Sequence, residues 1–184
     1  MAALPNLVTV AQFRDLPEEG EYAYELHHGE VVALTRPKMG HSKIQLRLME
    51  LLAPKLRTFG VVTMEFPYRP LAEFEYRVAD VVAVSRSRWD AIQPDENFVG
   101  APDLVIEVKS PSNTKRQLQE LVALCLANGS FECWIVDPEH SSVTVTRRDG
   151  STVVYSSGQD IPLAAFGSDH LPVAAIFEAL IERR

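Results

Sequence analysis

Hydrophobic residues recur along this chain with two different spacings, and their alternation predicts a mixed α/β protein. Apolar positions at helical spacing lie within residues 41–59 and 118–126, where each marks one face of an amphipathic helix. Short runs rich in Val, Ile and aromatic residues predict strands, and they occupy residues 22–27, 30–35, 61–66, 76–85, 104–109, 131–136, 143–147, 152–155 and 160–163. We therefore expect an α/β (α+β) domain around a mixed β-sheet flanked by helices.

The order of these segments indicates which strands are central. Residues 104–109 are apolar on both faces, as expected of a central strand. A helix capped at Ser112, Asn113 or Thr114 and ended by Gly129 follows, and then the strand at 131–136, so the two strands should run parallel. The three short strands after residue 142 predict an added antiparallel meander, and an apolar helix is expected at 173–181.

Two local features refine this outline. Pro54 lies inside the helical pattern of residues 41–59 and should kink that helix or end it early. The two cysteines, Cys125 and Cys133, lie in neither a metal-ligand nor a redox spacing, so we expect buried, reduced thiols.

Length and composition describe an ordinary soluble domain. The 184 residues are expected to form a single domain spanning 1–184, with 46% hydrophobic and 23% charged residues. The chain contains no apolar stretch of membrane-spanning length and no positively charged leader before its first apolar residues, which favours a cytoplasmic protein that is not bound to a membrane.

The charge balance limits how the chain could bind nucleic acid. The formal net charge is −7 and the pI is near 5.2, which argues against broad, nonspecific affinity. A local basic groove is still compatible with this balance, and so is an ordinary solvated surface. The candidate basic positions are Lys38 and Lys43 (with Arg36), Lys115 and Arg116, and Arg147 and Arg148.

Charged residues interrupt two of the apolar strands. Glu107 and Lys109 end the strand at 104–109; residues two apart on a strand share a face and lie roughly 6.6 Å apart. Asp80 stands in the apolar run 78–84. A carboxylate in such a run needs a partner, and two acids with one ammonium suit a divalent cation beside a developing negative charge. A buried ion pair without chemistry is an equally good interpretation of the residue types alone.

These residues resemble the signature of the PD-(D/E)XK nuclease superfamily, in which an acid precedes an acid–x–Lys triplet on a central strand. The wider arrangement is similar to one branch, the Uma family of restriction-endonuclease-like proteins. The matching stretches are YELHHGEVV (24–32), His41 at the start of a helix, VADVVAVS (78–85), GAPDLVIEVKSPSN (100–113) and NGSFECWIVDPE (128–139).

The resemblance implies a four-stranded mixed sheet with the site where the sheet opens. Asp80 and Glu107 would be metal ligands together with the backbone carbonyl of Val108, and Lys109 would stand beside the attacking water. Glu25 would be a further ligand or would orient a metal-bound water, and His41 matches with an accessory role. The implied activity is hydrolysis of phosphodiester bonds in nucleic acid, with DNA favoured, by a homodimer that cuts both strands.

The donor types indicate which metal to expect. Carboxylate and carbonyl oxygens are hard ligands suited to Mg²⁺ or Mn²⁺. The chain also departs from the family pattern: Ala79 replaces the usual Pro before the first acid, and Leu121 and Cys125 stand where a helical Lys and Tyr are common. Lys109 could replace the helical lysine. The alternative is a non-catalytic nucleic-acid-binding or interaction module that keeps the fold.

Overall fold

The computed structural model describes residues 7–16, 23–34 and 37–180. Its helices and strands follow one another along the chain: α1 (Val10–Arg14), β1 (Ala23–His27), β2 (Glu30–Leu34), α2 (Met39–Lys55), β3 (Gly60–Arg69), β4 (Arg77–Ser85), α3 (Arg86–Asp90), β5 (Phe98–Val99), β6 (Leu104–Val108), α4 (Lys115–Ala127), β7 (Glu132–Asp137), β8 (Ser142–Arg147), β9 (Thr152–Ser156), β10 (Asp160–Pro162), η1 (Ala164–Phe166), β11 (His170–Pro172), α5 (Val173–Phe177) and η2 (Glu178–Leu180).

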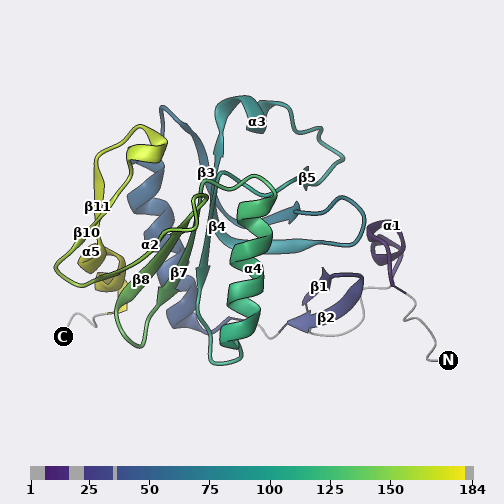
Figure 1. Cartoon of the computed structure of the whole chain (residues 1–184), viewed down its shortest axis with the longest axis horizontal. Helices are drawn as coiled ribbons and strands as arrows, with labels where there is room; N and C mark the ends of the chain where they lie inside the picture. The colour runs from purple at the N-terminus through teal and green to yellow at the C-terminus, as the bar shows by residue number, and fades with distance from the viewer. Residues whose placement is uncertain (1–6, 17–22, 35–36, 181–184) are drawn as a thin grey trace.

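A seven-stranded mixed sheet forms the centre of the molecule (Figure 1). Its strand order is β5-β3-β4-β6-β7-β8-β9. Strands β6 and β7 run parallel and are joined through α4, whereas β3–β4, β4–β6, β7–β8 and β8–β9 are antiparallel. The predicted mixed sheet, its central strand and the parallel unit are confirmed.

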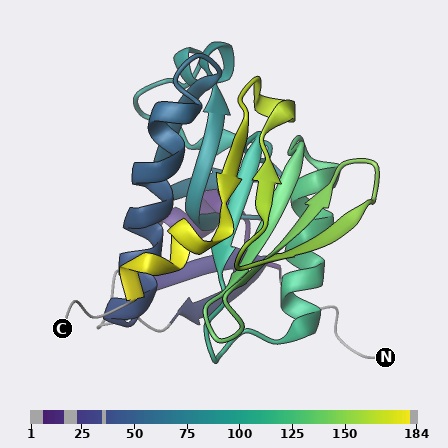
Figure 2. The same ribbon diagram turned by 90° about the vertical axis from the view of Figure 1, so that its left-hand side faces the viewer.

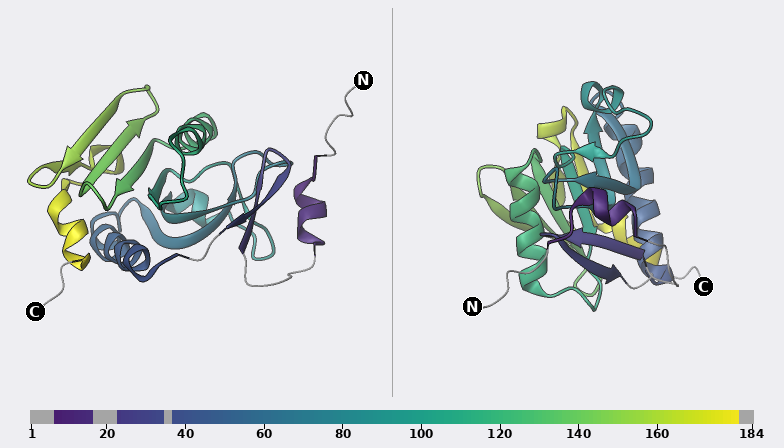
Figure 3. Two further views of the ribbon diagram at one scale, coloured as in Figure 1. Left: turned by 90° about the horizontal axis from the view of Figure 1, so that it is seen from below. Right: turned by 90° about the vertical axis from the view of Figure 1, so that its right-hand side faces the viewer.

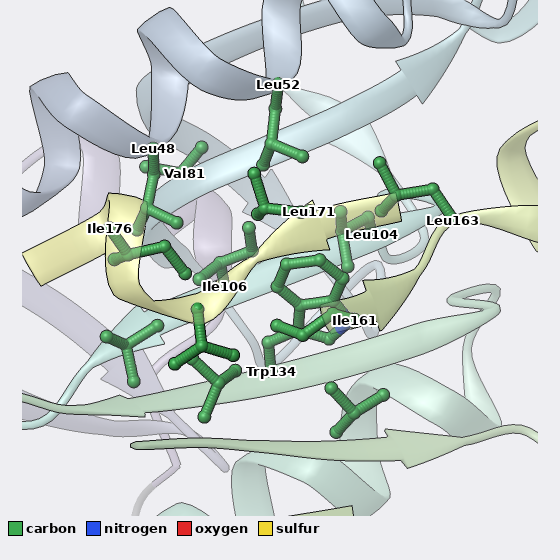
Figure 4. Close-up of a cluster of buried hydrophobic side chains, with 14 of the residues drawn as sticks. Leu48, Leu52, Val81, Leu104, Ile106, Trp134, Ile161, Leu163, Leu171 and Ile176 are labelled. Atoms are coloured by element: carbon green, nitrogen blue, oxygen red, sulfur yellow. The ribbon is translucent and has the colours of Figure 1, made fainter. Parts of the chain in front are cut away.

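Helices α2 and α4 cover opposite faces of this sheet, as the end-on view in Figure 3 shows. The α2 face buries the larger hydrophobic cluster, in which Leu48 and Leu52 of α2 pack over β4, β6 and Trp134 of β7 (Figure 4). The α4 face buries a second cluster that includes Val105 and Cys125. Both cysteines are free and buried, as predicted. Burying both sheet faces explains why β6 is apolar on both sides.

The C-terminal elements complete the α2 face. Strands β10 and β11 form a separate antiparallel pair, and α5 lies against α2 (Figure 2). Ile161, Leu171 and Ile176 place these elements in the α2-side cluster. The sequence prediction that residues 160–163 continue the meander is therefore wrong: only β8 and β9 extend the sheet, because β10 pairs with β11. The helix predicted at 173–181 is shorter: α5 ends at Phe177 and the 3-10 turn η2 follows. Val173, Ile176 and Phe177 are buried, whereas Leu180 is 37% exposed.

Local sequence signals set the ends of the two flanking helices. Thr114 caps α4 through a reciprocal capping box with Gln117, which selects one of the three predicted caps. Helix α2 contains Pro54 in its last turn and ends at Lys55, four residues before the predicted end at residue 59.

A hairpin of β1 and β2 docks beside the start of β4. An isolated bridge joins Leu26 to Tyr76, and the fully buried Glu75 accepts a 2.8 Å hydrogen bond from the backbone N–H of His28. Arg77 forms an ion pair with Glu75 at 2.8 Å, so the buried carboxylate has a positive partner. The described helices include none that is long and apolar enough to cross a membrane.

Candidate active site

The centre of the candidate site lies where strands β4 and β6 stop pairing. Their register runs through three residue pairs and ends at Val81↔Ile106, and Asp80 is the first β4 residue beyond it. The Oδ2 atom of Asp80 accepts a 2.6 Å hydrogen bond from the backbone N–H of Val108. The Asp80 side chain thus accepts the hydrogen bond from Val108 beyond the last backbone pair of β4 and β6. This bond fixes the Asp80 carboxylate at the end of β6.

Two side chains of α2 contact the same carboxylate. The Nε2 atom of His41 lies 3.1 Å from Asp80 Oδ2 and 3.1 Å from the carbonyl oxygen of Val108. One turn later, Gln45 donates a 2.8 Å hydrogen bond to Asp80 Oδ1. Residues four apart share a helix face, so α2 presents both side chains to Asp80.

The environment of His41 favours its charged form. Burial lowers the pKa of His41, but the hydrogen bond and the negative charge of Asp80, helped by the Val108 carbonyl, outweigh burial and raise the pKa overall. The Nδ1 atom is buried without a hydrogen-bond partner among the described residues. All polar contacts of the imidazole are therefore made through Nε2, toward two of the expected metal-binding groups.

Glu107 approaches Asp80 from the other side of the strand layer. Val108 belongs to the hydrophobic cluster beneath α2 and Val105 to the cluster beneath α4, so strand alternation places Glu107 on the α4 side. Burial raises the pKa of Glu107 well above its ordinary value; the negative charges of Asp80 and Glu25 and a side-chain hydrogen bond with Asp80 act in the same direction. The Asp80 carboxylate therefore lies near enough to Glu107 for its negative charge to act on that group.

The third predicted acid, Glu25, comes from the β1–β2 hairpin. It is 7% exposed, and its Oε1 atom accepts a 2.9 Å hydrogen bond from the backbone N–H of Val78. Its Oε2 atom lies 2.6 Å from Nε2 of His27. These contacts hold Glu25 at the start of β4, where its charge acts on Glu107. We call Glu25, Asp80 and Glu107 the carboxylate cluster.

Sequence reasoning missed two residues that touch this cluster. Gln45 is 3% exposed, and a buried polar residue within an apolar helix stripe was a usable signal. Its Nε2 atom donates to Glu65 as well as to Asp80. The register of β3 with β4 places Glu65 across from Asp80, and Glu65 has a left-handed φ of 52°. Nothing in the sequence separates Glu65 from an ordinary surface residue of its strand.

Lys109 follows β6 directly but pairs outside the carboxylate cluster. Its Nζ atom lies 2.7 Å from Oδ2 of Asp137, the last residue of β7. The parallel register pairs Val108 with Val136, so the next residues, Lys109 and Asp137, stand side by side. The hydrogen bond to Asp137 raises the pKa of Lys109. Within the described part of the chain, Lys109 forms no ion pair with the carboxylate cluster.

A second group of potential metal ligands surrounds this ion pair. Asp137, Glu139 and His140 have ligand atoms that all lie within 4.8 Å of one another, and they are the only such trio in the described residues; the carboxylate cluster does not meet that criterion. The Oδ2 atom of Asp137 already contacts Lys109 at 2.7 Å and Nδ1 of His140 at 3.1 Å. The ammonium of Lys109 thus stands where a cation would bind. We call these four residues the lysine cluster.

Among the candidate basic residues, Lys38, Lys43, Lys115, Arg116 and Arg148 are exposed. Arg147 is half-buried and pairs with Glu132 at 3.0 Å. Lys38 caps α2 and Lys115 begins α4, and both helices start at the end of the sheet where β6 finishes (Figure 1). Lys43 lies in the second turn of α2. Arg116 pairs with Glu120 at 2.7 Å, which offsets its charge. Arg36 lies outside the described residues.

Comparison with known proteins identifies the family. The family model of Uma2, described as "Putative restriction endonuclease", matches residues 10–174. The chain belongs to the Uma2 family. No functionally curated protein matches it. A crystal structure described as a putative nuclease of DUF820 from Anabaena variabilis is 24% identical, with a TM-score of 0.81 over 95% of this chain and 99% of that chain, and the likeness confirms the restriction-endonuclease-like fold.

The departures of this Uma2 chain from the family pattern all fill the α4-side core. Cys125 and Ala79 are buried there and Leu121 packs against them. The Sγ atom of Cys125 lies 3.3 Å from the hydroxyl of the buried Tyr68. Burial raises the pKa of Tyr68 well above its ordinary value, and the charges of Cys125 and Glu107 add to the effect. Helix α4 thus offers apolar packing beneath Glu107, and no ammonium comes from these positions.

The carboxylate cluster is largely buried: Glu25 is 7% exposed and the Asp80 side chain is 14% exposed. Two surface hollows lie elsewhere: one is lined by residues of the segment from Arg88 to Val99, and the other by residues 9–11, 69, 72 and 73. Neither includes a member of the carboxylate cluster. The site is therefore identified by its hydrogen bonds and charges rather than by a cavity.

Proposed function

We propose that this Uma2 protein is a metal-dependent endonuclease that hydrolyses phosphodiester bonds in nucleic acid, with DNA as the expected substrate. The observation that supports it is the negative charge of the carboxylate cluster. Burial, followed by the negative charges of Asp80 and Glu25, raises the pKa of Glu107 well above its ordinary value. No Lys or Arg of the described chain forms an ion pair with the cluster. A cation would relieve this repulsion.

The donors in the cluster fit Mg²⁺ or Mn²⁺. Asp80, Glu107 and the Val108 carbonyl would hold the ion, with Glu25 as a further ligand, and all of these donors are hard oxygens. The contacts of His41 with Asp80 Oδ2 and the Val108 carbonyl support the proposed accessory role of this residue. A bound divalent cation would supply Lewis-acid stabilisation of a phosphate and lower the pKa of a water molecule.

The protein's own groups have separate tasks in this proposal. His41 and Gln45 keep the Asp80 carboxylate oriented through their hydrogen bonds. Lys109, once directed to the reacting phosphate, would stabilise the negative charge that develops there. Lys38, Lys43, Lys115 and Arg116 would contact the phosphate backbone, which positions the substrate without reading its sequence.

Several broader features belong to the same proposal. One domain spans residues 1–184, the protein acts in the cytoplasm, and two copies pair so that both strands of a duplex are cut.

Cleavage of supercoiled plasmid and of single-stranded DNA with Mg²⁺ or Mn²⁺ tests the proposal. Asp80→Asn and Glu107→Gln should each reduce cleavage by about 100-fold or more, since each removes a charge that acts on the reacting centre. Lys109→Ala should also reduce it strongly. Asp95→Asn, at an exposed acid in the loop before β5, is the matched control. Full activity in the Glu107 variant would refute its assigned role.

The second candidate function is a non-catalytic binding module. It is supported by the ion pair of Lys109 with Asp137 and by the apolar packing of Leu121 and Cys125 on α4. Calorimetry separates the two functions: a nuclease should bind Mn²⁺ through Glu107, whereas absence of metal binding together with retained nucleic-acid binding favours the module.

A further inference from the structure

The contact between Lys109 and Asp137 follows from the architecture of the sheet. Both residues directly continue the parallel β6–β7 register, whose last pair is Val108↔Val136. The backbone N–H of Lys109 also donates a 2.8 Å hydrogen bond to the carbonyl of Val136. The backbone of Lys109 is therefore held beside β7, and its ammonium contacts Asp137 at 2.7 Å.

Asp137 is itself anchored by the turn that follows it. Its Oδ1 atom accepts hydrogen bonds from the backbone N–H groups of Glu139 at 3.0 Å and His140 at 3.3 Å. Its Oδ2 atom is left for Lys109 and for the His140 side chain. A carboxylate fixed by two backbone donors is an immobile partner, so the ammonium must move if the pair is to break.

The charges around the end of β6 separate into two groups. The electrostatic partners of Lys109 are Asp137 and Glu139, whereas those of Glu107 include Asp80 and Glu25. Glu107 and Lys109 are only two residues apart on the chain. The ammonium therefore faces the β7–β8 turn and leaves the carboxylate cluster without its charge.

We propose that Asp137 is a positioning residue that restrains Lys109 away from the carboxylate cluster, so that Lys109 reaches a substrate phosphate only when this ion pair breaks. The inference rests on the proposed nuclease function for its catalytic consequence. It assigns Asp137 an inhibitory contribution to the reaction rate, since each turnover must separate the two charges. Removing the Asp137 charge should then increase cleavage.

Asp137→Asn is the informative variant because it removes the charge and keeps an oxygen that can accept from Glu139 and His140. Glu139→Gln is the matched control, since it removes a nearby charge that acts on Lys109 without being bonded to it. Two readouts are needed: the acylation rate of Lys109 by an amine-reactive ester, followed by mass spectrometry, and the rate of Mn²⁺-dependent plasmid cleavage. Asp137→Ser provides a second variant if Asp137→Asn fails to fold by circular dichroism.

We expect Asp137→Asn to increase both Lys109 acylation and cleavage by about two- to fivefold, the range expected for loss of one partly exposed ion pair. Adding Lys109→Ala should abolish the gain in cleavage. Unchanged acylation overturns the proposal, and so does increased acylation with slower cleavage, which would mean that Asp137 holds Lys109 in its working position. If the wild-type protein cleaves nothing, the nuclease function fails, while acylation still decides whether Asp137 restrains Lys109.

Discussion

The two ends of one short segment, Glu107 and Lys109, belong to clusters of opposite character. The carboxylate cluster is largely buried and lacks a Lys or Arg partner among the described residues, and the pKa of Glu107 is strongly raised. The lysine cluster is more exposed, and its ammonium pairs with Asp137 at 2.7 Å. The hydrogen bonds from Lys109 and His140 outweigh burial and lower the pKa of Asp137. We therefore place the proposed cation site at the carboxylate cluster, which has no Lys or Arg partner among the described residues, rather than at the acidic groups of the lysine cluster.

The largest expected effect is the loss of metal binding in Glu107→Gln. Mn²⁺ affinity should fall by about 100-fold or more, since even outer-shell changes cost 10–100-fold at metal sites. The metal-free variant should also be more stable by about 1 kcal/mol, because a site that evolved for function is relieved of repulsion. Isothermal calorimetry and urea unfolding measure the two effects. Asp137→Asn should leave Mn²⁺ affinity unchanged. A comparable loss of Mn²⁺ affinity in Asp137→Asn would mean that the lysine cluster, rather than the carboxylate cluster, binds the metal.

A second effect concerns the support of Asp80 by α2. Gln45→Leu removes the amide that donates to Asp80 and Glu65 and leaves the carboxylates facing an apolar side chain. The metal-free protein should lose about 1–3 kcal/mol, the typical cost of a buried polar group without its partner. Urea unfolding with and without Mn²⁺ tests this, and the loss should be smaller when the metal is bound. An equal loss of stability with and without Mn²⁺ would mean that Gln45 does not support the metal-binding carboxylates.

The clusters should also respond to pH in opposite directions. The raised pKa of Glu107 means that its stability contribution is complete below its ordinary value of 4.5 and is lost as pH rises through the folded value. The lowered pKa of Asp137 gives stability above 3.8 that is lost as pH falls through its folded value. The free energy of unfolding of Glu107→Gln should therefore increase relative to that of the wild type as pH rises. The free energy of unfolding of Asp137→Asn should increase relative to that of the wild type as pH falls. If the unfolding free energies of both variants changed with pH in the same direction relative to the wild type, the contrast between the two clusters would be contradicted.

The smallest effect is on stability in the lysine cluster. The side chains of Lys109 and Asp137 are 34% and 18% exposed, so solvent screens their attraction. Asp137→Asn should cost less than about 1 kcal/mol near neutral pH, and the cost should shrink at high salt. A cost that is large and independent of salt would mean that the turn hydrogen bonds, rather than the ion pair, carry the effect.

Much of this architecture could be predicted because it depends on local periodicity. The apolar runs located the central strand and its parallel partner, and Asp80 and Glu107 stood out as charges in apolar strands. The structure brings these two together and adds Glu25 through the hairpin. The apolar pattern of residues 160–163 predicts a strand but does not specify its partner, so the prediction that it joins the meander is wrong. In the structure β10 pairs with β11.

Other features depend on register and could not be predicted from the chain. The pairing of Lys109 with Asp137 requires the parallel alignment of β6 with β7, which no local signal encodes. Glu65 reaches Gln45 through a left-handed backbone conformation. The sequence offered a clue only for Gln45, a polar residue in an apolar helix stripe.

The most direct test of the account is the anomalous diffraction of crystals soaked in Mn²⁺. A cation bound for charge balance should give a peak between the carboxylates of Asp80 and Glu107, next to the Val108 carbonyl. The lysine cluster should give none, since Lys109 already neutralises Asp137. A peak at Asp137, Glu139 and His140, with none at Asp80, would contradict the central claim.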